Sequence, residues 1–105
     1  MREYDYIYDY QEDRAIVSLD GKYGVIDRSG KEIVPPKYDF IHDFRKNRAI
    51  VMLDGKYGVI DLDGKELVPP KYDFIHTYQE GRAVVRLDDK WGVIDLDGDI
   101  IEELK

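Results

Sequence analysis

A six-residue motif occurs three times in this chain at a constant spacing. Residues 22–27 read KYGVID, residues 56–61 repeat them, and residues 90–95 read KWGVID, so each copy starts 34 residues after the previous one. A fixed period of this size is typical of repeat proteins, in which each unit buries its apolar face against its neighbours. We therefore expect one domain of three units, at about residues 1–34, 35–68 and 69–105. A residue present in every unit is first of all structural, because a catalytic centre needs its groups only once.

The pattern of apolar residues and turns within one unit predicts an all-β fold. In the second unit, residues 48–53 alternate in a way that puts one set of side chains on a core face, and the Asp-Gly pair at 54–55 favours a tight hairpin turn. Residues 56–61 form the returning strand, residues 65–68 a third strand, and the proline pair at 69–70 is expected to end it. The chain is thus predicted to be three antiparallel β-meanders. The equivalent hairpin turns are expected at 20–21 and 88–89, and helix is limited to a single turn near 78–80.

The two ends of the chain depart from the internal repeat. Residues 99–105 lack the proline pair and add carboxylates, and the first unit opens on Arg2 and Glu3 without prolines. Repeat arrays need atypical terminal units to keep their exposed stacking faces soluble, and added charge discourages edge-to-edge pairing. An open array is favoured over the alternatives, which are a closed small barrel and a ring completed by a second copy.

Composition excludes several classes of function. The chain has 23 acidic and 16 basic residues, for a net charge of −7, and no cysteine. An acidic surface argues against nucleic-acid binding and against docking on anionic lipid, and a chain without thiols has neither disulfides nor thiolate metal sites. The N-terminal residues have no apolar segment of the signal-peptide type. A cytoplasmic location is therefore expected, although the chain could be a fragment of a longer or secreted protein.

The repeated motif carries a family likeness. The KWGVID sequence at 90–95 with its turn glycine Gly98, and the PPKYD sequence at 69–73 after the turn of the middle unit, resemble the WG repeat of bacterial proteins. The signature tryptophan is present only as Trp91, while Tyr23 and Tyr57 take its place in the other units, so the position requires a large aromatic ring rather than an indole. The resemblance implies a tandem interaction or scaffold module and supplies no active site.

The aromatic-glycine pairs have a structural and a functional interpretation. Glycine weakens a strand and marks a close approach of a backbone or a ring, which predicts a ladder of rings that each pack on the glycine of the next unit. The functional alternative is a row of rings that stacks on sugars or on a peptide. The residues concerned are Tyr23, Gly24, Tyr57, Gly58, Trp91 and Gly92.

Arginine and aspartate also recur in every unit. An arginine opens one strand and an aspartate closes its hairpin partner, so the two are predicted to form an ion pair across the hairpin that fixes strand register. The alternative, a row of carboxylates for acid–base chemistry, lacks a nucleophile. The residues concerned are Arg14, Arg48, Arg82, Asp27, Asp61 and Asp95.

No cofactor or metal site is expected. The Asp-x-Asp-Gly sequences at 61–64 and 95–98 lack the further ligands of a calcium loop and are interpreted as turns. His42 and His76 occupy equivalent positions, but Tyr8 fills the third, so the position needs an amphipathic ring rather than a zinc ligand. With no catalytic constellation in view, the chain is not expected to be an enzyme.

The leading hypothesis is a noncatalytic module that binds a protein partner or further repeats through its exposed tyrosines, its end faces or a sheet edge. The alternatives are a glycan-binding module and a ligand-free spacer, including a designed consensus repeat. Tyr4, Tyr6, Tyr8 and Tyr10 alternate along one stretch and are expected to share a face. An open face with flat-lying rings would favour glycans.

Overall fold

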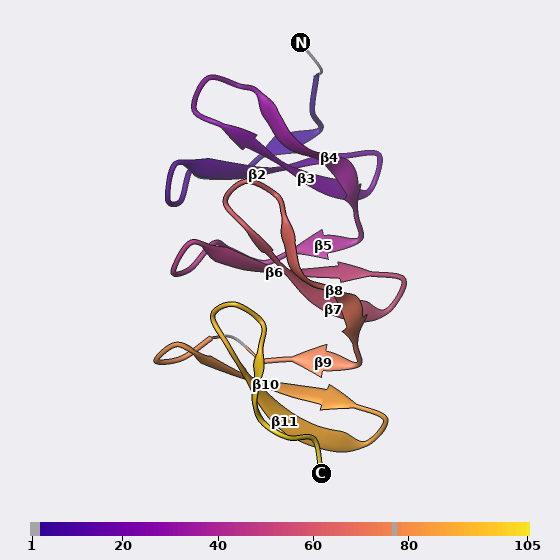
Figure 1. The fold of residues 1–105 in the computed structure, drawn as a ribbon. Helices are drawn as coiled ribbons and strands as arrows, with labels where there is room; N and C mark the ends of the chain where they lie inside the picture. The colour runs from indigo at the N-terminus through magenta and orange to yellow at the C-terminus, as the bar shows by residue number, and fades with distance from the viewer. Residues whose placement is uncertain (1–2, 77) are drawn as a thin grey trace.

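The computed structural model describes residues 3–76 and 78–105, and in this part of the chain every regular element is a β-strand. Three four-stranded sheets are stacked along the long axis of a molecule that measures 46 × 25 × 18 Å, with the two termini at opposite ends (Figure 1). None of the sheets closes into a barrel, which confirms the open array of tandem β-repeats. The strands are β1 (Tyr6–Ile7), β2 (Arg14–Leu19), β3 (Lys22–Asp27), β4 (Glu32–Tyr38), β5 (Phe40–Ile41), β6 (Arg48–Leu53), β7 (Lys56–Asp61), β8 (Glu66–Tyr72), β9 (Phe74–Ile75), β10 (Arg82–Leu87), β11 (Lys90–Asp95) and β12 (Ile100–Glu102).

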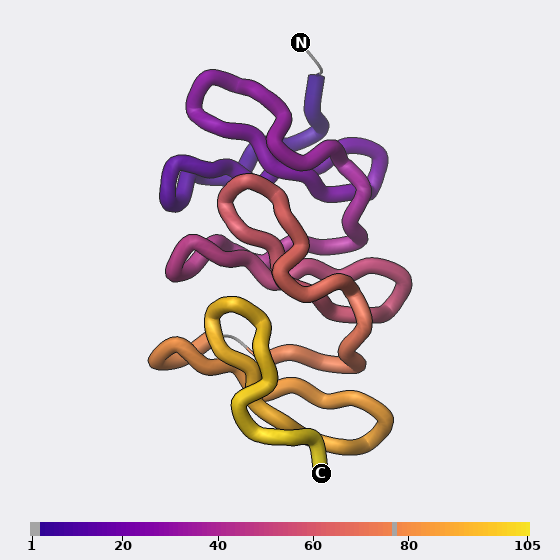
Figure 2. The backbone as a smooth tube through the Cα atoms, in the orientation of Figure 1, coloured from indigo at the N-terminus to yellow at the C-terminus, as the bar shows by residue number. Residues whose placement is uncertain are grey.

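Each sheet is an antiparallel meander whose strands lie side by side in chain order, so the backbone follows the same path three times (Figure 2). The central hairpin of the first sheet turns at Asp20 and Gly21, whose φ angles are +53° and +79°. Two positive φ angles are typical of the hairpin turn that matches the natural twist of the strands. The equivalent residues of the other units, 54–55 and 88–89, also have positive φ. The predicted hairpin turns are confirmed.

A second tight turn precedes the central hairpin in each unit. In the third unit, Gln79 and Arg82 form a β-bridge around Glu80 and Gly81, whose φ angles are +52° and +78°. The predicted helical turn near residues 78–80 is therefore wrong, because two positive φ angles close a two-residue hairpin instead of starting a helix. The segment before the central hairpin is thus a tight two-residue turn closed by a β-bridge.

The proline pairs do not end their strands. β4 and β8 continue through the prolines to Tyr38 and Tyr72, so the sheets separate after these tyrosines rather than at residues 34 and 68. Both strands lie at the outer edge of their sheet, and the pairing of β7 with β8 shifts register between Tyr57 and Val59. Proline is tolerated at such a position because an edge bulge does not require its missing N–H group.

The core lies between the sheets. Ala49 and Val51 of β6 belong to the apolar cluster shared with the first sheet, and Ile50, on the other side of the strand, belongs to the cluster shared with the third. Both faces of the middle sheet are thus buried, whereas alternation predicted a single core face. We call the boundary between the first and second sheets the first seam and that between the second and third sheets the second seam.

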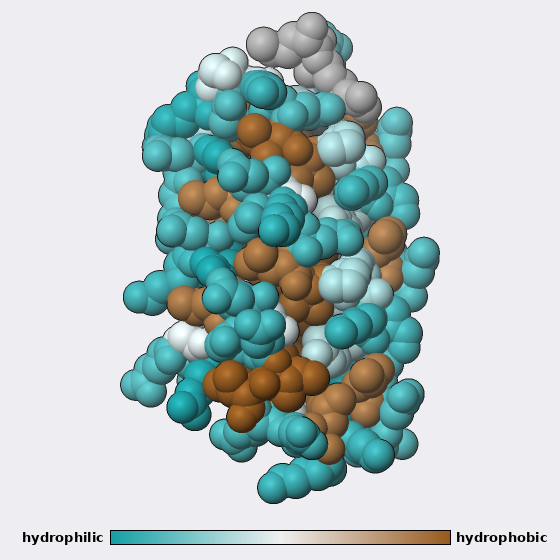
Figure 3. All heavy atoms as spheres, in the orientation of Figure 1, coloured by the Kyte–Doolittle hydropathy of each residue, from teal (hydrophilic) through white to brown (hydrophobic). Residues whose placement is uncertain are grey.

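The outer surface shows the same periodicity. On the face toward the viewer in Figure 3, hydrophobic side chains gather at three successive levels and are separated by hydrophilic ones. The hydrophobic area is largest at the lowest level, in the C-terminal unit, where Ile100 and Ile101 of β12 are exposed. The described residues include no helix that could cross a membrane.

Candidate functional site

The repeated glycines lie under the proline bulges. A Cβ atom built on Gly24 would lie 2.4 Å from the carbonyl oxygen of Val34, and one built on Gly58 would lie 2.5 Å from that of Val68. Both distances are far below a van der Waals contact of about 3.5 Å. The predicted close approach to each glycine is confirmed, but the prediction that a ring of the neighbouring unit makes it is wrong. The last strand of the same unit crosses the glycine, not a ring of the neighbouring unit. The third copy, Gly92, faces the backbone of Glu102 in the same way.

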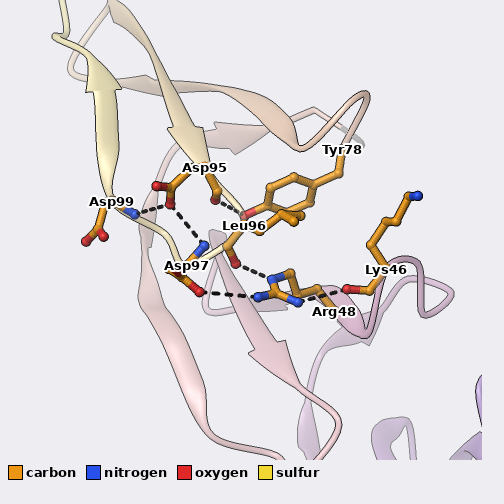
Figure 4. Close-up of polar contacts among 7 residues, drawn as sticks. All are labelled: Lys46, Arg48, Tyr78, Asp95, Leu96, Asp97 and Asp99. Atoms are coloured by element: carbon orange, nitrogen blue, oxygen red, sulfur yellow. Dashed lines mark hydrogen bonds and ion pairs between the residues drawn. The ribbon is translucent and has the colours of Figure 1, made fainter.

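The repeated arginines join neighbouring units. Arg14 Nε donates to the carbonyl oxygen of Leu62 at 2.7 Å, and Arg48 Nε donates to that of Leu96. A second guanidinium nitrogen of Arg48 lies 3.3 Å from a carboxylate oxygen of Asp97 (Figure 4). Only 17% of each of the two arginine side chains is exposed. We call each of these contacts an arginine clamp.

The predicted ion pair across the hairpin is therefore wrong. Arg14 and Asp27 are opposite each other in the β2–β3 register, yet the described residues include no ion pair between them. The arginine side chain extends across the seam instead, because a backbone carbonyl group in a turn of the next unit lies within hydrogen-bonding distance of its planar guanidinium group. The same holds for Arg48 and Asp61.

The repeated aspartates hold the turn that receives the clamp. Asp27 Oδ1 accepts hydrogen bonds from the backbone N–H groups of Ser29 at 2.9 Å and Lys31 at 3.0 Å, and from the Ser29 hydroxyl at 2.7 Å. The hydroxyl of Ser29 is the main reason why the pKa of Asp27 lies below its ordinary value. These bonds stabilise a side-chain-closed turn. The aspartates thus act on the backbone of their own unit.

Three carboxylates gather at the corresponding turn of the third unit. Oxygens of Asp95, Asp97 and Asp99 lie within 4.8 Å of one another. Asp95 Oδ1 already accepts the N–H groups of Asp97 and Asp99, each at 2.9 Å, and Asp97 binds Arg48 (Figure 4). Calcium takes six to eight oxygen ligands. The hydrogen bonds and the clamp explain why these carboxylates lie close together, because they belong to one turn.

Aromatic side chains form a row along one side of the molecule, in which the rings are in contact from Tyr6 to His42 and again from Tyr57 to Trp91. Three equivalent positions in each unit contribute to it, one on the strand that opens the sheet, one just after that strand, and one on the strand that carries the repeated glycine. We call this set the aromatic row. Its members are Tyr6, Tyr8, Tyr23, Phe40, His42, Tyr57, Phe74, His76 and Trp91.

The aromatic row crosses both seams. Tyr23 and Phe40 lie on opposite sides of the first seam with ring centroids 5.1 Å apart, and Tyr57 and Phe74 are 5.1 Å apart across the second. The exposed fraction is 36% for Phe40 and 45% for Trp91. Phe40 and Phe74 were not singled out from the sequence, although their 34-residue equivalence with Tyr6 could have shown that they belong to the same row.

The four N-terminal tyrosines do not share a face, which corrects the prediction. Tyr6 and Tyr8 lie in the aromatic row with their centroids 4.5 Å apart. Tyr4 and Tyr10 pack instead on the N-terminal apolar cluster, and the Tyr10 hydroxyl donates to the carbonyl oxygen of Asp27 at 2.9 Å. The alternation fails because β1 spans only two residues. The repeat could have predicted this difference, since Tyr4 lies 34 residues before Tyr38, which is buried.

The third sheet exposes residues whose equivalents in the first two sheets are buried in a seam. Val84 is 39% exposed, whereas its equivalents in the two seams, Ile16 and Ile50, are each 6% exposed. Arg82 is 63% exposed and lies 3.8 Å from Glu102, in place of a clamp. Glu102 occupies the position that a buried valine fills in the other two units, so the end carries charge as the terminal residues predicted.

The fold and its site define an open stack of β-meanders with a side row of aromatic residues. A model of the WG containing repeat matches residues 2–23, 23–57 and 57–91, and the chain therefore belongs to the family of WG-repeat proteins. A search of curated protein sequences finds no match.

Solved structures are similar in fold alone. Hsv2 of Kluyveromyces lactis matches with a TM-score of 0.50 and 14% sequence identity over 94% of this chain and 36% of that protein. A second structure of the same protein, with a complete loop 6CD, gives a TM-score of 0.49 at 14% identity and the same coverage. The present chain thus spans little more than a third of the length of Hsv2.

Proposed function

We propose that this chain is a noncatalytic interaction module that binds an extended segment of a partner protein along the aromatic row. The observation that supports the proposal is the extension of the row over all three units. Its rings touch across both seams, and Tyr6 and Trp91 at its two ends are 57% and 45% exposed. A partner segment laid along the stack would meet a ring in every unit.

The row has the physical character of a protein-binding surface. Tyrosine and tryptophan dominate the energetics of interfaces because they bury a large area at a small cost in side-chain entropy. The arginine clamps hold adjacent units in one relative position, so the rings are arranged before a partner arrives. Such preorganisation lowers the entropic cost of binding. The net charge of −7 favours a basic partner segment by attraction during the encounter.

A glycan is the less favoured ligand. A sugar ring stacks its C–H face on a flat aromatic face, but most contacting pairs in this row meet at steep angles, and the near-parallel pairs are Tyr8 with Tyr23 at 19° and His76 with Trp91 at 29°. The planes of Tyr6 and Tyr8 differ by 73°, and those of Phe74 and His76 differ by 84°. Edges and faces therefore alternate along the surface, which suits the varied side chains of a peptide better than a series of similar sugars.

A peptide-display selection against the intact protein tests the proposal. Selected peptides are labelled, and their dissociation constants are measured by fluorescence anisotropy for the wild type, for Tyr6→Ser and for Trp91→Ser. The matched control is Ile101→Ser, which removes a side chain of the same exposure, 45%, from outside the row. A glycan panel is screened in parallel.

We expect both row variants to weaken binding about tenfold or more, as loss of an aromatic anchor does, and the control to bind like the wild type. Trp91 is the single tryptophan, so its fluorescence should also change when a peptide binds. Equal affinity of the row variants, or binding of glycans without any peptide, would refute the proposal.

A further inference from the structure

A hollow beside the aromatic row lies at the first seam. Its volume is about 160 Å³, and its lining includes Tyr8, Tyr23, Phe40, Ile41, His42 and Asp43. We propose that this hollow binds the ammonium group at the end of a lysine side chain, methylated or not, supplied by the partner segment. The inference rests on the proposed function, and it names the chemistry by which the segment is recognised.

The arrangement of the rings suits a compact cation. Phe40 is tilted by 59° to Tyr23 and by 82° to His42, with centroid distances of 5.1 and 4.8 Å. Rings at these angles border the hollow from different directions instead of forming one platform. A cation within about 6 Å of a ring centroid is attracted by the negative face of the ring. Several rings around one small hollow add such contacts together.

Charge favours the same ligand. Asp43 brings a carboxylate to the hollow, and it has no ion-pair partner among the residues that the structure describes. Lys22, on the strand that carries Tyr23, is held by Asp39 with a distance of 2.5 Å between its ammonium nitrogen and the carboxylate oxygen. Burial lowers the pKa of His42 below 6.5, so this ring is neutral at pH 7. A positive ligand would therefore complete the site.

Arginine fits less well than lysine. The rings of Tyr8 and Tyr23 are nearly parallel, at 19°, but their centroids are only 6.1 Å apart. A planar guanidinium inserted between two rings needs about 7 Å, twice a normal contact distance. An ammonium group needs no such slot, because it is compact and can approach a ring from any side. Arg45 and Arg48 also line an adjoining hollow together with His42 and Asp43, and their charge opposes any cation bound at the first seam.

The composition of the hollow is specific to the first seam. At the second seam, the position of Tyr8 is taken by His42 and that of Asp43 by Thr77, which lies outside the described residues. The wall then has one electron-rich phenol fewer and no carboxylate. The repeat thus supplies its own control, because the same fold accepts histidine and threonine at these two positions.

The experiment titrates the intact protein with three probes and follows backbone amide NMR signals. The probes are the N-acetyl methylamides of lysine, of trimethyllysine and of the neutral trimethyllysine analogue in which carbon replaces the charged nitrogen. The same titrations use the double variant Tyr8→His with Asp43→Thr, and separately Arg45→Gln, which installs the residue found at the equivalent positions 11 and 79. Thermal melts check that each variant is folded.

We expect a charged probe to shift signals around the first seam and to bind about fivefold or more tightly than the neutral analogue, the factor that a partly exposed cation–π contact supplies. The double variant should lose this preference, and Arg45→Gln should bind more tightly than the wild type. The two charged probes together show whether methylation matters. Equal binding of the neutral analogue, unchanged binding by the double variant, or no shift with either charged probe would overturn the inference. Selected peptides that bind the row without a lysine would overturn it while leaving the proposed function intact.

Discussion

Replacing Gly58 by valine is expected to destabilise the middle unit. The new Cβ would lie 2.5 Å from the carbonyl oxygen of Val68, 2.9 Å from the nitrogen of Pro70 and 3.0 Å from the carbonyl carbon of Pro69. All three are backbone atoms of β8, so no side chain can rotate away. Relief requires the bulged strand to move by about 1 Å to restore a normal contact of about 3.5 Å.

Two opposing effects decide the magnitude. Valine is preferred over glycine in a strand by up to about 1 kcal/mol, and overpacking of a well-packed site costs about 1–3 kcal/mol or more. The clash at Gly58 involves three rigid atoms, which places it at the upper end of that range. We therefore expect a net loss of about 2 kcal/mol in the free energy of unfolding, or about 8–16 °C in the melting temperature of a domain of this size.

Thermal and urea melts of the wild type and of Gly58→Val measure this effect. The matched control is Gly55→Asp in the neighbouring turn, where a Cβ meets no atom within 4 Å and where the third unit already carries Asp89 at φ +67°. The control should lose far less stability. An unchanged or higher midpoint for Gly58→Val would show that the glycine is not a packing residue.

Three other predictions concern the seams and the turns. Arg48→Lys should cost about 1.5–3 kcal/mol, the value of a hydrogen bond to a charged group, whereas Arg82→Lys, at a side chain that is 63% exposed beside Glu102, should change urea stability by less than about 0.5 kcal/mol. A similar loss for both would contradict the clamp. A strong chelator should leave the melting temperature unchanged, because hydrogen bonds and the clamp already hold the carboxylates of Asp95 and Asp97 in the third-unit turn; stability that calcium restores would contradict this. The pKa of His42 is lowered by burial from 6.5, so the unfolded chain takes up the proton first as the pH falls. Stability that is fully present above about pH 6.5 should decline below it, and His42→Tyr, the residue at the equivalent position 8, should remove this part of the pH dependence in melts between pH 5 and 7.

The repeat and the hairpins could be predicted because their causes are local. A two-residue Asp-Gly turn between branched segments specifies a hairpin from the conformational preferences of those residues alone. A constant 34-residue spacing specifies a stack, since one meander cannot bury its apolar face by itself. The all-β class and the turns at 20–21, 54–55 and 88–89 followed from these two signals, and the open array followed from the atypical, charged terminal units.

The contacts of the recurrent polar side chains could not be predicted in the same way. Arg48 and Asp61 are neighbours across a hairpin, so the sequence predicts an ion pair between them. Arg48 instead binds Leu96 and Asp97 of the following unit. A long side chain on a stacked sheet reaches as far across the seam as along its own strand. Which carbonyl it meets depends on how closely the sheets approach, and sequence spacing does not state that distance.

By itself, the sequence determined the repeated unit, its central hairpin turn and its number of copies, because backbone preferences and apolar periodicity act within a few residues. The tertiary structure alone decided which residues face outward. The aromatic row exists because stacking brings Tyr23 beside Phe40 and Tyr57 beside Phe74. Tyr4 is half-buried because the N-terminal segment packs on the apolar cluster of Ala15, Val17 and Ile26 in the first sheet. Exposure is a property of the tertiary structure, since a side chain is buried only where another segment of the chain covers it.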